Sequence, residues 1–426
     1  MDGTSIIEGM WVEDDKVYVD RVTPAKRGLL RQFFEWLEAR DRTPEELLAL
    51  CLDRISARDE QLRAWVEVSP QPALGKGPLT GIPFAAKDIY ETRDLATEYG
   101  SPLYAGRKGS TDAALVTLLR TRGAILVGKT QTTAFAYFDP APTCNPRDPA
   151  RTPGGSSSGS AVAVAAGMVP FALGTQTQGS ILRPASFCGV VGFKPSTGIL
   201  PLEGVLPFAP SLDTAGFFTQ TADDMQMLWG HLGNPAGAPR RTLTVPSLMP
   251  PVDAEMEQAF RDAAKKLAEH FALNVVEMPA RFPELVPAAK LVNAYEGART
   301  HEARWREHGP RIGHKLSQLV EEGLRISVDQ YRAAITTIVE VKRDMSRQFG
   351  QYPVLITPAA PGIAPLGLGS TGDPVMNTPW TALGVPAISI PMPSPNGLPL
   401  GLQLVSDSGS DASLLALAAE VESLLQ

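Results

Sequence analysis

The chain has 426 residues, of which 43% are hydrophobic and 20% are charged, so a disordered, collagen-like or mucin-like chain is excluded. Its 39 Lys and Arg residues stand against 46 Asp and Glu residues, a net charge of −7, and no basic run is long enough to form a face. Binding to nucleic acid or to an anionic membrane surface is therefore not expected.

The cysteines and the apolar stretches indicate the compartment. Cys51, Cys144 and Cys188 lie too far apart for a disulfide framework or a zinc site, which fits a reducing environment. Residues 1–16 are acidic and lack the basic region of a signal peptide. The longest mostly apolar stretch, residues 161–173, is too short to span a bilayer. We expect a cytoplasmic protein without a membrane partner.

The first 42 residues are expected to form an appendage. Alternating apolar residues predict a short hairpin with strands at residues 11–12 and 17–19 around the acidic pair at 14–15. An amphipathic pattern then predicts a helix over residues 29–39.

A second helix is predicted to begin after Thr43. Thr43 can cap the helix, Pro44 suits its first position, and Glu46 completes a capping box. The apolar periodicity carries this helix to about Ala57. We expect the main domain, residues 43–426, to begin here.

From this point short apolar runs alternate with helical periods, which is typical of an α/β layered sheet. The predicted elements are a helix at 112–122, a strand at 124–127, a helix after Ser158, and strands at 171–173 and 190–193.

The segment from about 235 to 352 has a different pattern. Two long stretches have helical periodicity, and only one or two strands are expected nearby, so a mostly helical lobe is predicted. β-branched runs then return, and a last helix begins near Ala412. Both ends of the chain therefore contribute to one composite domain. The predicted helices of the lobe are 253–271 and 328–349, and the later strands are 354–356, 387–390 and 400–405.

Residues 123–130 match G-x-x-x-x-G-K-[ST], the pattern of a phosphate-binding loop. That loop follows a strand and is flexible between its glycines. Here a helix precedes Gly123, and the intervening Ala-Ile-Leu-Val is itself a buried strand. Gly123 is better interpreted as the residue that ends the helix, so nucleotide binding is not expected.

Two Gly-containing turns are candidate sites. The run Thr152 to Ser160 has the composition of a linker, but it leads directly into a helix of Ala and Val that requires burial. The turn at 174–184 also follows an apolar strand, and its N–H groups around residues 177–180 could stabilise an oxyanion. A satisfied surface turn is the alternative for this second segment.

Lys87 follows the short apolar strand in the segment 81–88. Such a lysine is usually a surface residue, but a buried one loses its proton readily and can act as a base. Histidine, the common partner of a nucleophilic serine, is absent from these motifs, and no H-E-x-x-H spacing indicates a metal site. The five histidines are His231, His270, His301, His308 and His314.

Together these segments resemble the amidase signature family, over most of residues 43–233 and 353–426. The matching segments are GIPFAAKD at 81–88, STDAALVTLLRTRGAILVGKT at 110–130, RTPGGSSSGSAVAVAAG at 151–167, GTQTQGSILRPASFCGVVGFKPS at 174–196, SLDTAG at 211–216 and GLPLGLQLV at 397–405. The resemblance implies a large, mixed, twisted β-sheet with helices on both faces.

The resemblance also implies a Ser-Ser-Lys hydrolase. Ser180 is then the nucleophile, Ser156 the bridging serine after a cis peptide bond, and Lys87 the base. The backbone N–H groups of residues 177–180, which are Thr177, Gln178, Gly179 and Ser180, form the oxyanion hole. The implied reaction is cleavage of a C–N bond in a small amide through an acyl-enzyme, with no metal or cofactor.

Two positions depart from the family pattern. Gln176 replaces the usual Asp of a G-T-D motif, and Gln178 replaces the first Gly of a Gly-Gly-Ser motif. Both glutamines are candidate pocket residues, because the first changes a charge near the loop and the second adds a bulky side chain to the oxyanion hole. The other residues expected to line the pocket are Tyr137, Phe138, Asn377 and Trp380.

A different class of function stays open. The changed loop is also compatible with a non-catalytic or partner-dependent subunit, including one that supplies ammonia to an amidotransferase. The asparagine-rich loop expected in such a subunit is replaced here by Tyr-Phe-Asp-Pro-Ala at 137–141, which disfavours this interpretation. Assembly as a homodimer is also left open.

Overall fold

The computed structural model describes residues 10–13, 16–19 and 28–426. Strands β1 (Met10–Glu13) and β2 (Lys16–Val19) pair antiparallel, which confirms the predicted hairpin. The acidic pair predicted at its turn lies outside the described residues, as does most of the segment judged to lack a signal peptide.

The two N-terminal helices begin where the sequence predicts. Helix α1 (Leu29–Ala39) has the predicted bounds, and α2 (Pro44–Leu62) continues past the predicted end at Ala57. Thr43 Oγ1 accepts a hydrogen bond from Glu46 N at 3.3 Å, and Glu46 Oε2 accepts one from Thr43 N at 2.8 Å. This capping box fixes the start of α2.

An eleven-stranded mixed sheet runs through the molecule. Its strands lie in the order β10 (Ala272–Val276), β9 (Thr242–Pro246), β11 (Val354–Pro358), β13 (Leu400–Ser406), β12 (Ala387–Met392), β7 (Val191–Lys194), β8 (Thr214–Thr219), β6 (Phe171–Gln176), β4 (Pro83–Lys87), β5 (Ile125–Thr130) and β3 (Trp65–Gln71). Strands β10, β9 and β11 are parallel, as are β6, β4 and β5, and the other pairs are antiparallel. The predicted mixed α/β architecture is confirmed.

Helices cover both faces of this sheet. Along β4, Phe84 and Ala86 belong to the larger hydrophobic core, whereas Ala85 points to the opposite face and joins a second core. The second core includes residues 161–164 of α4 (Ser158–Ala165). The larger core takes its side chains from several helices. Among them are α3 (Ala114–Thr121), α6 (Ala222–His231) and α12 (Asp411–Leu425).

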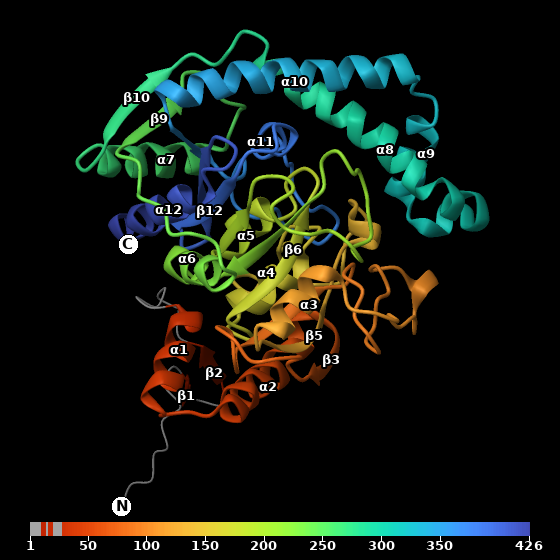
Figure 1. Ribbon diagram of the computed structural model, residues 1–426, viewed down its shortest axis with the longest axis vertical. Coiled ribbons are helices and arrows are strands. Elements are labelled where there is room, and N and C mark those ends of the chain that lie inside the picture. The colour runs from red at the N-terminus through yellow and green to blue at the C-terminus, as the bar shows by residue number, and fades with distance from the viewer. Residues whose placement is uncertain (1–9, 14–15, 20–27) are drawn as a thin grey trace, which may run out of the picture.

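The segment predicted as a helical lobe holds four long helices and two strands. Its helices are α7 (Ala254–Leu267), α8 (Leu285–His308), α9 (His314–Gly323) and α10 (Val328–Gln351). Strands β9 and β10 extend the sheet beside β11, so this segment is part of the sheet edge. Helices α8, α9 and α10 lie at the end of the molecule opposite α1 and α2 (Figure 1).

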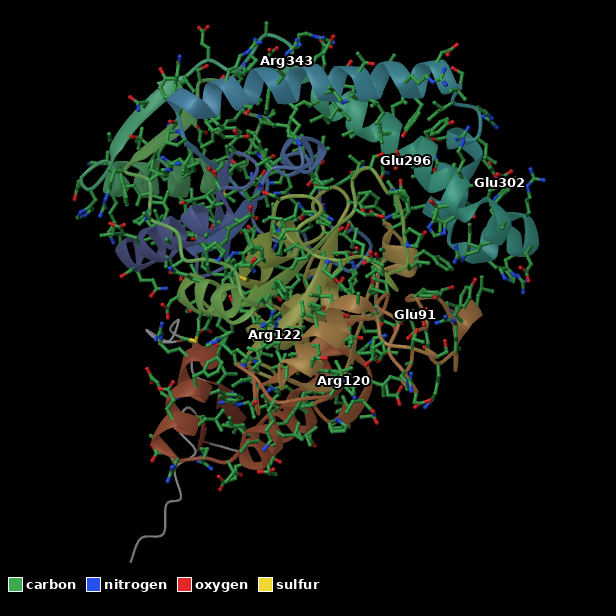
Figure 2. The ribbon with its side chains drawn as sticks, viewed as in Figure 1. Glu91, Arg120, Arg122, Glu296, Glu302 and Arg343 are labelled. Atoms are coloured by element: carbon green, nitrogen blue, oxygen red, sulfur yellow. The ribbon has the colours of Figure 1, made fainter. Side chains whose placement is uncertain are left out.

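Helix α8 is tied to the body of the protein through Glu296 (Figure 2). Its carboxylate accepts hydrogen bonds from Ser211 N at 2.9 Å and Ser211 Oγ at 2.5 Å, and from Tyr331 Oη of α10 at 2.7 Å. The lobe is thereby joined to the loop that precedes β8. Among the described helices, none is both long and apolar enough to cross a membrane.

Candidate active site

The segment that resembles a phosphate-binding loop is part of the sheet. Gly123 follows the end of α3 with φ of +100°, and β5 begins two residues later. Lys129 is fully buried in β5, where its ammonium lies 3.2 Å from Asp88 and donates to the carbonyls of Tyr90 and Ala96. Its donors are already occupied, so the segment is a buried strand and not a phosphate loop.

The Gly/Ser run forms a packed turn that leads into α4. The peptide bond between Gly155 and Ser156 is cis, as the resemblance implies. Ser157 Oγ donates to the carbonyl of Thr175 at 3.2 Å, and Ser158 Oγ donates to that of Gly154 at 2.7 Å. These bonds hold Ser156 at the end of β6.

Lys87 is the last residue of β4 and is fully buried. Because β4 and β6 are parallel, their carboxyl ends lie at the same edge of the sheet, and Lys87 lies beside Thr175 near the end of β6. Lys87 Nζ lies 2.7 Å from Ser156 Oγ and 2.8 Å from Thr175 Oγ1. Burial lowers the pKa of Lys87 well below its usual value, while the charge of Asp213 opposes this shift.

The turn after β6 presents unpaired backbone donors. The N–H groups of residues 177–180 donate hydrogen bonds to no other described residue. Four successive free donors of this kind suit the charge of an oxyanion. Ser180 is half-buried at the end of this turn, and its hydroxyl shares no hydrogen bond with that of Ser156 in the described structure.

Ser156 and this turn open onto one pocket. Its lining comes from residues 136–138 and 177–180, and from Ser156, Arg183, Phe208, Asn293 and Thr371. The lining includes three aromatic rings, and Tyr137 is stacked on Phe208 with 5.1 Å between ring centroids. Asn293 of α8 brings the helical lobe to the same pocket.

The sequence profile of the family described as Amidase matches residues 46–415. The chain belongs to the amidase family. A glutamyl-tRNA(Gln) amidotransferase subunit from Legionella pneumophila (strain Corby) is 31% identical over 467 aligned positions, with 91% of this chain and 95% of that protein covered.

Solved structures of the amidase family have the same fold. A crystal structure of an amidase superposes with a TM-score of 0.85 at 30% identity, covering 93% of this chain and all of the other. The glutamyl-tRNA(Gln) amidotransferase subunit from Thermotoga maritima superposes with a TM-score of 0.77 at 27% identity, covering 88% of this chain and 90% of that one.

The six side chains predicted to line the pocket of this amidase-family chain divide into two groups. Tyr137, Phe138 and Gln178 line it. Gln176 does not. It is fully buried, its Oε1 accepts hydrogen bonds from Ile181 N at 2.8 Å and Leu182 N at 3.0 Å, and its Nε2 donates to Thr381 Oγ1. Gln176 holds the start of α5 (Leu182–Cys188).

Asn377 and Trp380 also lie outside the lining. Asn377 Nδ2 donates to Ala359 O and Gln403 Oε1, and the ring of Trp380 packs against Phe282 with centroids 5.3 Å apart. Both are buried, Trp380 in α11 (Thr378–Ala382) and Asn377 at its N-terminal end. Neither residue belongs to the pocket lining, which differs from the expectation: Trp380 packs in the core, and Asn377 uses its Nδ2 there, although its Oδ1 has no partner.

Sequence reasoning missed two groups around Lys87. Thr175 Oγ1 contacts the ammonium directly, and Asp213 accepts a hydrogen bond from Thr177 Oγ1 at 2.6 Å. Burial raises the pKa of Asp213 to about 6, although its bonds to Thr177 and to the N–H groups of Phe208 and Ala209 oppose the rise. Asp213 lies within the SLDTAG segment, so the sequence showed the motif that contains it. The sequence did not show that Asp213 accepts a hydrogen bond from Thr177.

No cluster of three or more His, Cys, Asp or Glu residues suited to a metal occurs in the described part of the chain. His301 is the buried histidine nearest the pocket aromatics, at 5.3 Å from the Phe208 ring. Burial lowers its pKa to about 3, so it is neutral at ordinary pH.

Proposed function

We propose that this protein is a hydrolase that cleaves the C–N bond of a small carboxamide. The observation that carries the proposal is the 2.7 Å contact between Lys87 Nζ and Ser156 Oγ, beside a pocket that also contains Ser180. A lysine whose pKa is lowered by burial can accept a proton, so it can act as the general base that a serine nucleophile requires.

In the proposed reaction Ser180 Oγ attacks the carbonyl carbon of the amide. Its proton moves to Ser156 as Ser156 passes its own proton to the neutral amine of Lys87. The free N–H groups of residues 177–180 stabilise the negative oxygen of the tetrahedral intermediate. The C–N bond then breaks, the leaving amine recovers a proton through Ser156, and water hydrolyses the acyl-serine.

The relay requires Ser156 and Ser180 to approach each other when substrate binds. In the described structure their hydroxyls are not hydrogen-bonded, and catalytic hydrogen bonds often form fully only with substrate present. Both serines line the same pocket, so a substrate bound there would contact both.

The first test is turnover of a panel of aliphatic, aromatic and ureido amides by the purified protein and by Ser180→Ala. We expect Ser180→Ala to lower kcat by at least about 1,000-fold without changing the fold, because only one hydroxyl at a turn is lost. A fluorophosphonate probe is expected to label wild type and to leave the variant unlabelled. Wild-type turnover by Ser180→Ala would rule out the assignment.

A second candidate function is favoured by the relatives, which are amidotransferase subunits. In that case the same pocket cleaves an amide only when a partner protein is bound and passes the ammonia to it. Labelling of Ser180 in the isolated chain without turnover of any amide would favour this function. Turnover by the isolated chain would favour the hydrolase.

The proposal includes a small-molecule substrate and a reducing compartment. Cys51, Cys144 and Cys188 are free and buried, which supports a cytoplasmic setting. Homodimer formation stays a prediction, and the molar mass in solution tests it.

A further inference from the structure

Arg183 is a buried cation next to the proposed nucleophile. It is the second residue of α5, three positions after Ser180, and only 2% of it is exposed. It lines the pocket, and among the described residues it is the one charged side chain that does so. The lining therefore carries a positive charge and no carboxylate, and the carboxylate whose charge acts on Arg183, that of Asp373, lies outside the lining.

The guanidinium of Arg183 is held by three hydrogen bonds, but some of its N–H donors have no partner. Its Nε donates to Thr371 O at 2.6 Å, and its Nη2 donates to Gly155 O at 2.6 Å and to Thr371 Oγ1 at 3.2 Å. Its Nη1 is buried and has no partner. Because a guanidinium has five N–H donors, the two on Nη1 are left free.

The free donors lie beside the oxyanion turn. A Cβ placed on Gly179 would come within 3.1 Å of Arg183 Nη1, so this atom borders the turn that carries the free N–H groups. The ring of Phe138 lies 5.9 Å from the guanidinium carbon on the pocket wall. Burial lowers the pKa of Arg183 to about 10, so the group stays charged near neutral pH.

We propose that Arg183 binds a carboxylate of the substrate. A buried guanidinium with two free donors matches one carboxylate, through charge-assisted hydrogen bonds. Because Nη1 borders Gly179, the carboxylate must lie only a few bonds from the carbonyl that the oxyanion turn would hold. The substrate class is therefore the monoamide of a short dicarboxylic acid. This inference rests on the proposed amide hydrolysis.

A purely structural role is the competing explanation. Asn377 Oδ1 is also buried without a partner, and it lies 2.6 Å from the same Cβ position on Gly179. A water molecule between Asn377 and Nη1 would satisfy both atoms, and Arg183 would then only clamp Gly155 and Thr371. A clamp predicts no preference for a charged substrate.

The test compares the monoamide of a three- or four-carbon dicarboxylic acid with the neutral diamide of the same acid. We expect wild type to have a kcat/KM at least about 100-fold higher for the monoamide, since a site built to pair a group rejects the analogue that lacks it. Arg183→Met is expected to bring this ratio close to one. The proposal is overturned if wild type treats the two amides alike.

Arg147→Met is the matched control. Arg147 Nε donates to Cys188 O at 3.3 Å near the end of α5, and Arg147 does not line the pocket. The control removes the same charge near the same helix, so the substrate ratio is expected to stay as in wild type. An equal loss of the ratio in both variants would overturn the proposal. If Arg183→Met does not fold, the wild-type comparison still decides.

Binding to Ser180→Ala separates this inference from the proposed function. We expect calorimetry to show the monoamide binding at least about tenfold more tightly than the diamide. Selective binding without turnover of any amide by wild type would reject the hydrolase and keep the carboxylate site. Turnover of both amides with equal affinity would reject the carboxylate site and keep the hydrolase.

Discussion

Lys87 is surrounded by groups that favour its neutral form. It is fully buried, and its two close polar contacts are the hydroxyls of Ser156 and Thr175, which are uncharged. The charge of Asp213 acts in the opposite direction but is the smaller effect, so the pKa of Lys87 falls well below its ordinary value. The amine can therefore be free of its proton at a pH where a surface lysine is charged.

This environment predicts that kcat/KM falls at low pH, which gives the pH profile an acid limb. We expect kcat/KM to rise with pH and to level off once Lys87 is neutral. Lys87→Ala should lower the rate by about 100- to 10,000-fold. Lys87→Arg should be as inactive, because arginine stays protonated. The measurement is kcat/KM against pH for wild type and both variants.

Asp213→Asn is the control for this limb, since the pKa of Asp213 is raised to about 6 and its own titration could also make the activity depend on pH. The limb is expected to persist in Asp213→Asn and to shift to lower pH, because the charge that raises the pKa of Lys87 is removed. A limb that disappears in this variant, or a Lys87→Arg protein with near-normal activity, would contradict the role of Lys87 as the base.

At the scale of elements, the packing of β5 shows that the G-x-x-x-x-G-K-[ST] motif at 123–130 is a buried strand. The strand lies between β4 and β3, and its Lys129 forms an ion pair with Asp88, the residue after β4. Burial lowers the pKa of Lys129, whereas the charge of Asp88 raises it. The pair has no exposed atoms, and Lys129 also donates to the carbonyls of Tyr90 and Ala96 and to the hydroxyl of Thr97. Its role is to join strands and the loop at residues 88–97.

We predict that Lys129→Met lowers the free energy of unfolding by about 3–5 kcal/mol, because Asp88 is left as an uncompensated buried charge. Urea denaturation measures the loss. Lys108→Met is the matched control, since Lys108 pairs with Glu67 at 3.7 Å but is 58% exposed, and such pairs contribute about 0–1 kcal/mol. The nucleotide-loop interpretation would be restored by a different outcome: wild type binds ATP, and Lys129→Met is as stable as wild type but does not bind ATP.

At the scale of the whole molecule, the C-terminal helix is joined to α6 through a buried carboxylate. Glu422 Oε2 of α12 accepts a hydrogen bond from Ala222 N at the start of α6, at 2.6 Å, and Oε1 has no partner. Burial, with additional repulsion from Asp224 and Asp223, raises the pKa of Glu422 to about 7. The protonated form therefore suits the folded state better than the charged form.

The sign of this shift predicts how stability changes with pH. Because the folded pKa lies above the unfolded one, Glu422 contributes its full stability below about pH 4.5 and loses it as the pH rises through about 7. Glu422→Gln removes this titration, so the variant should gain up to about 3 kcal/mol relative to wild type between pH 5 and pH 8. Thermal or urea unfolding at both pH values measures the gain.

Glu420→Gln is the control, since Glu420 lies on the same helix and pairs with Arg241 at the surface. The two charges removed are equal, but only the one at Glu422 is buried. A pH dependence of stability that Glu420→Gln changes as much as Glu422→Gln would argue against the buried carboxylate as its source.

The sequence by itself determined features that depend on neighbouring residues. The cap at Thr43 and the turn at Gly123 just after α3 involve atoms a few positions apart, so their signals are contiguous in the chain. The mixed α/β class followed from the alternation of elements. The motifs of Lys87, Ser156 and Ser180 also predicted a common site, and the structure brings Lys87 to Ser156 and both serines to one pocket.

Only the tertiary structure decided which distant residues meet. The parallel pairing of β4 and β6 places Thr175 against Lys87, and β9 and β10 join the sheet edge although their segment has mostly helical periodicity. Gln176 turns into the core to hold α5, whereas Arg183 turns to the pocket. These outcomes depend on long-range packing and on which buried polar atoms find partners, and residue type or local spacing does not encode either.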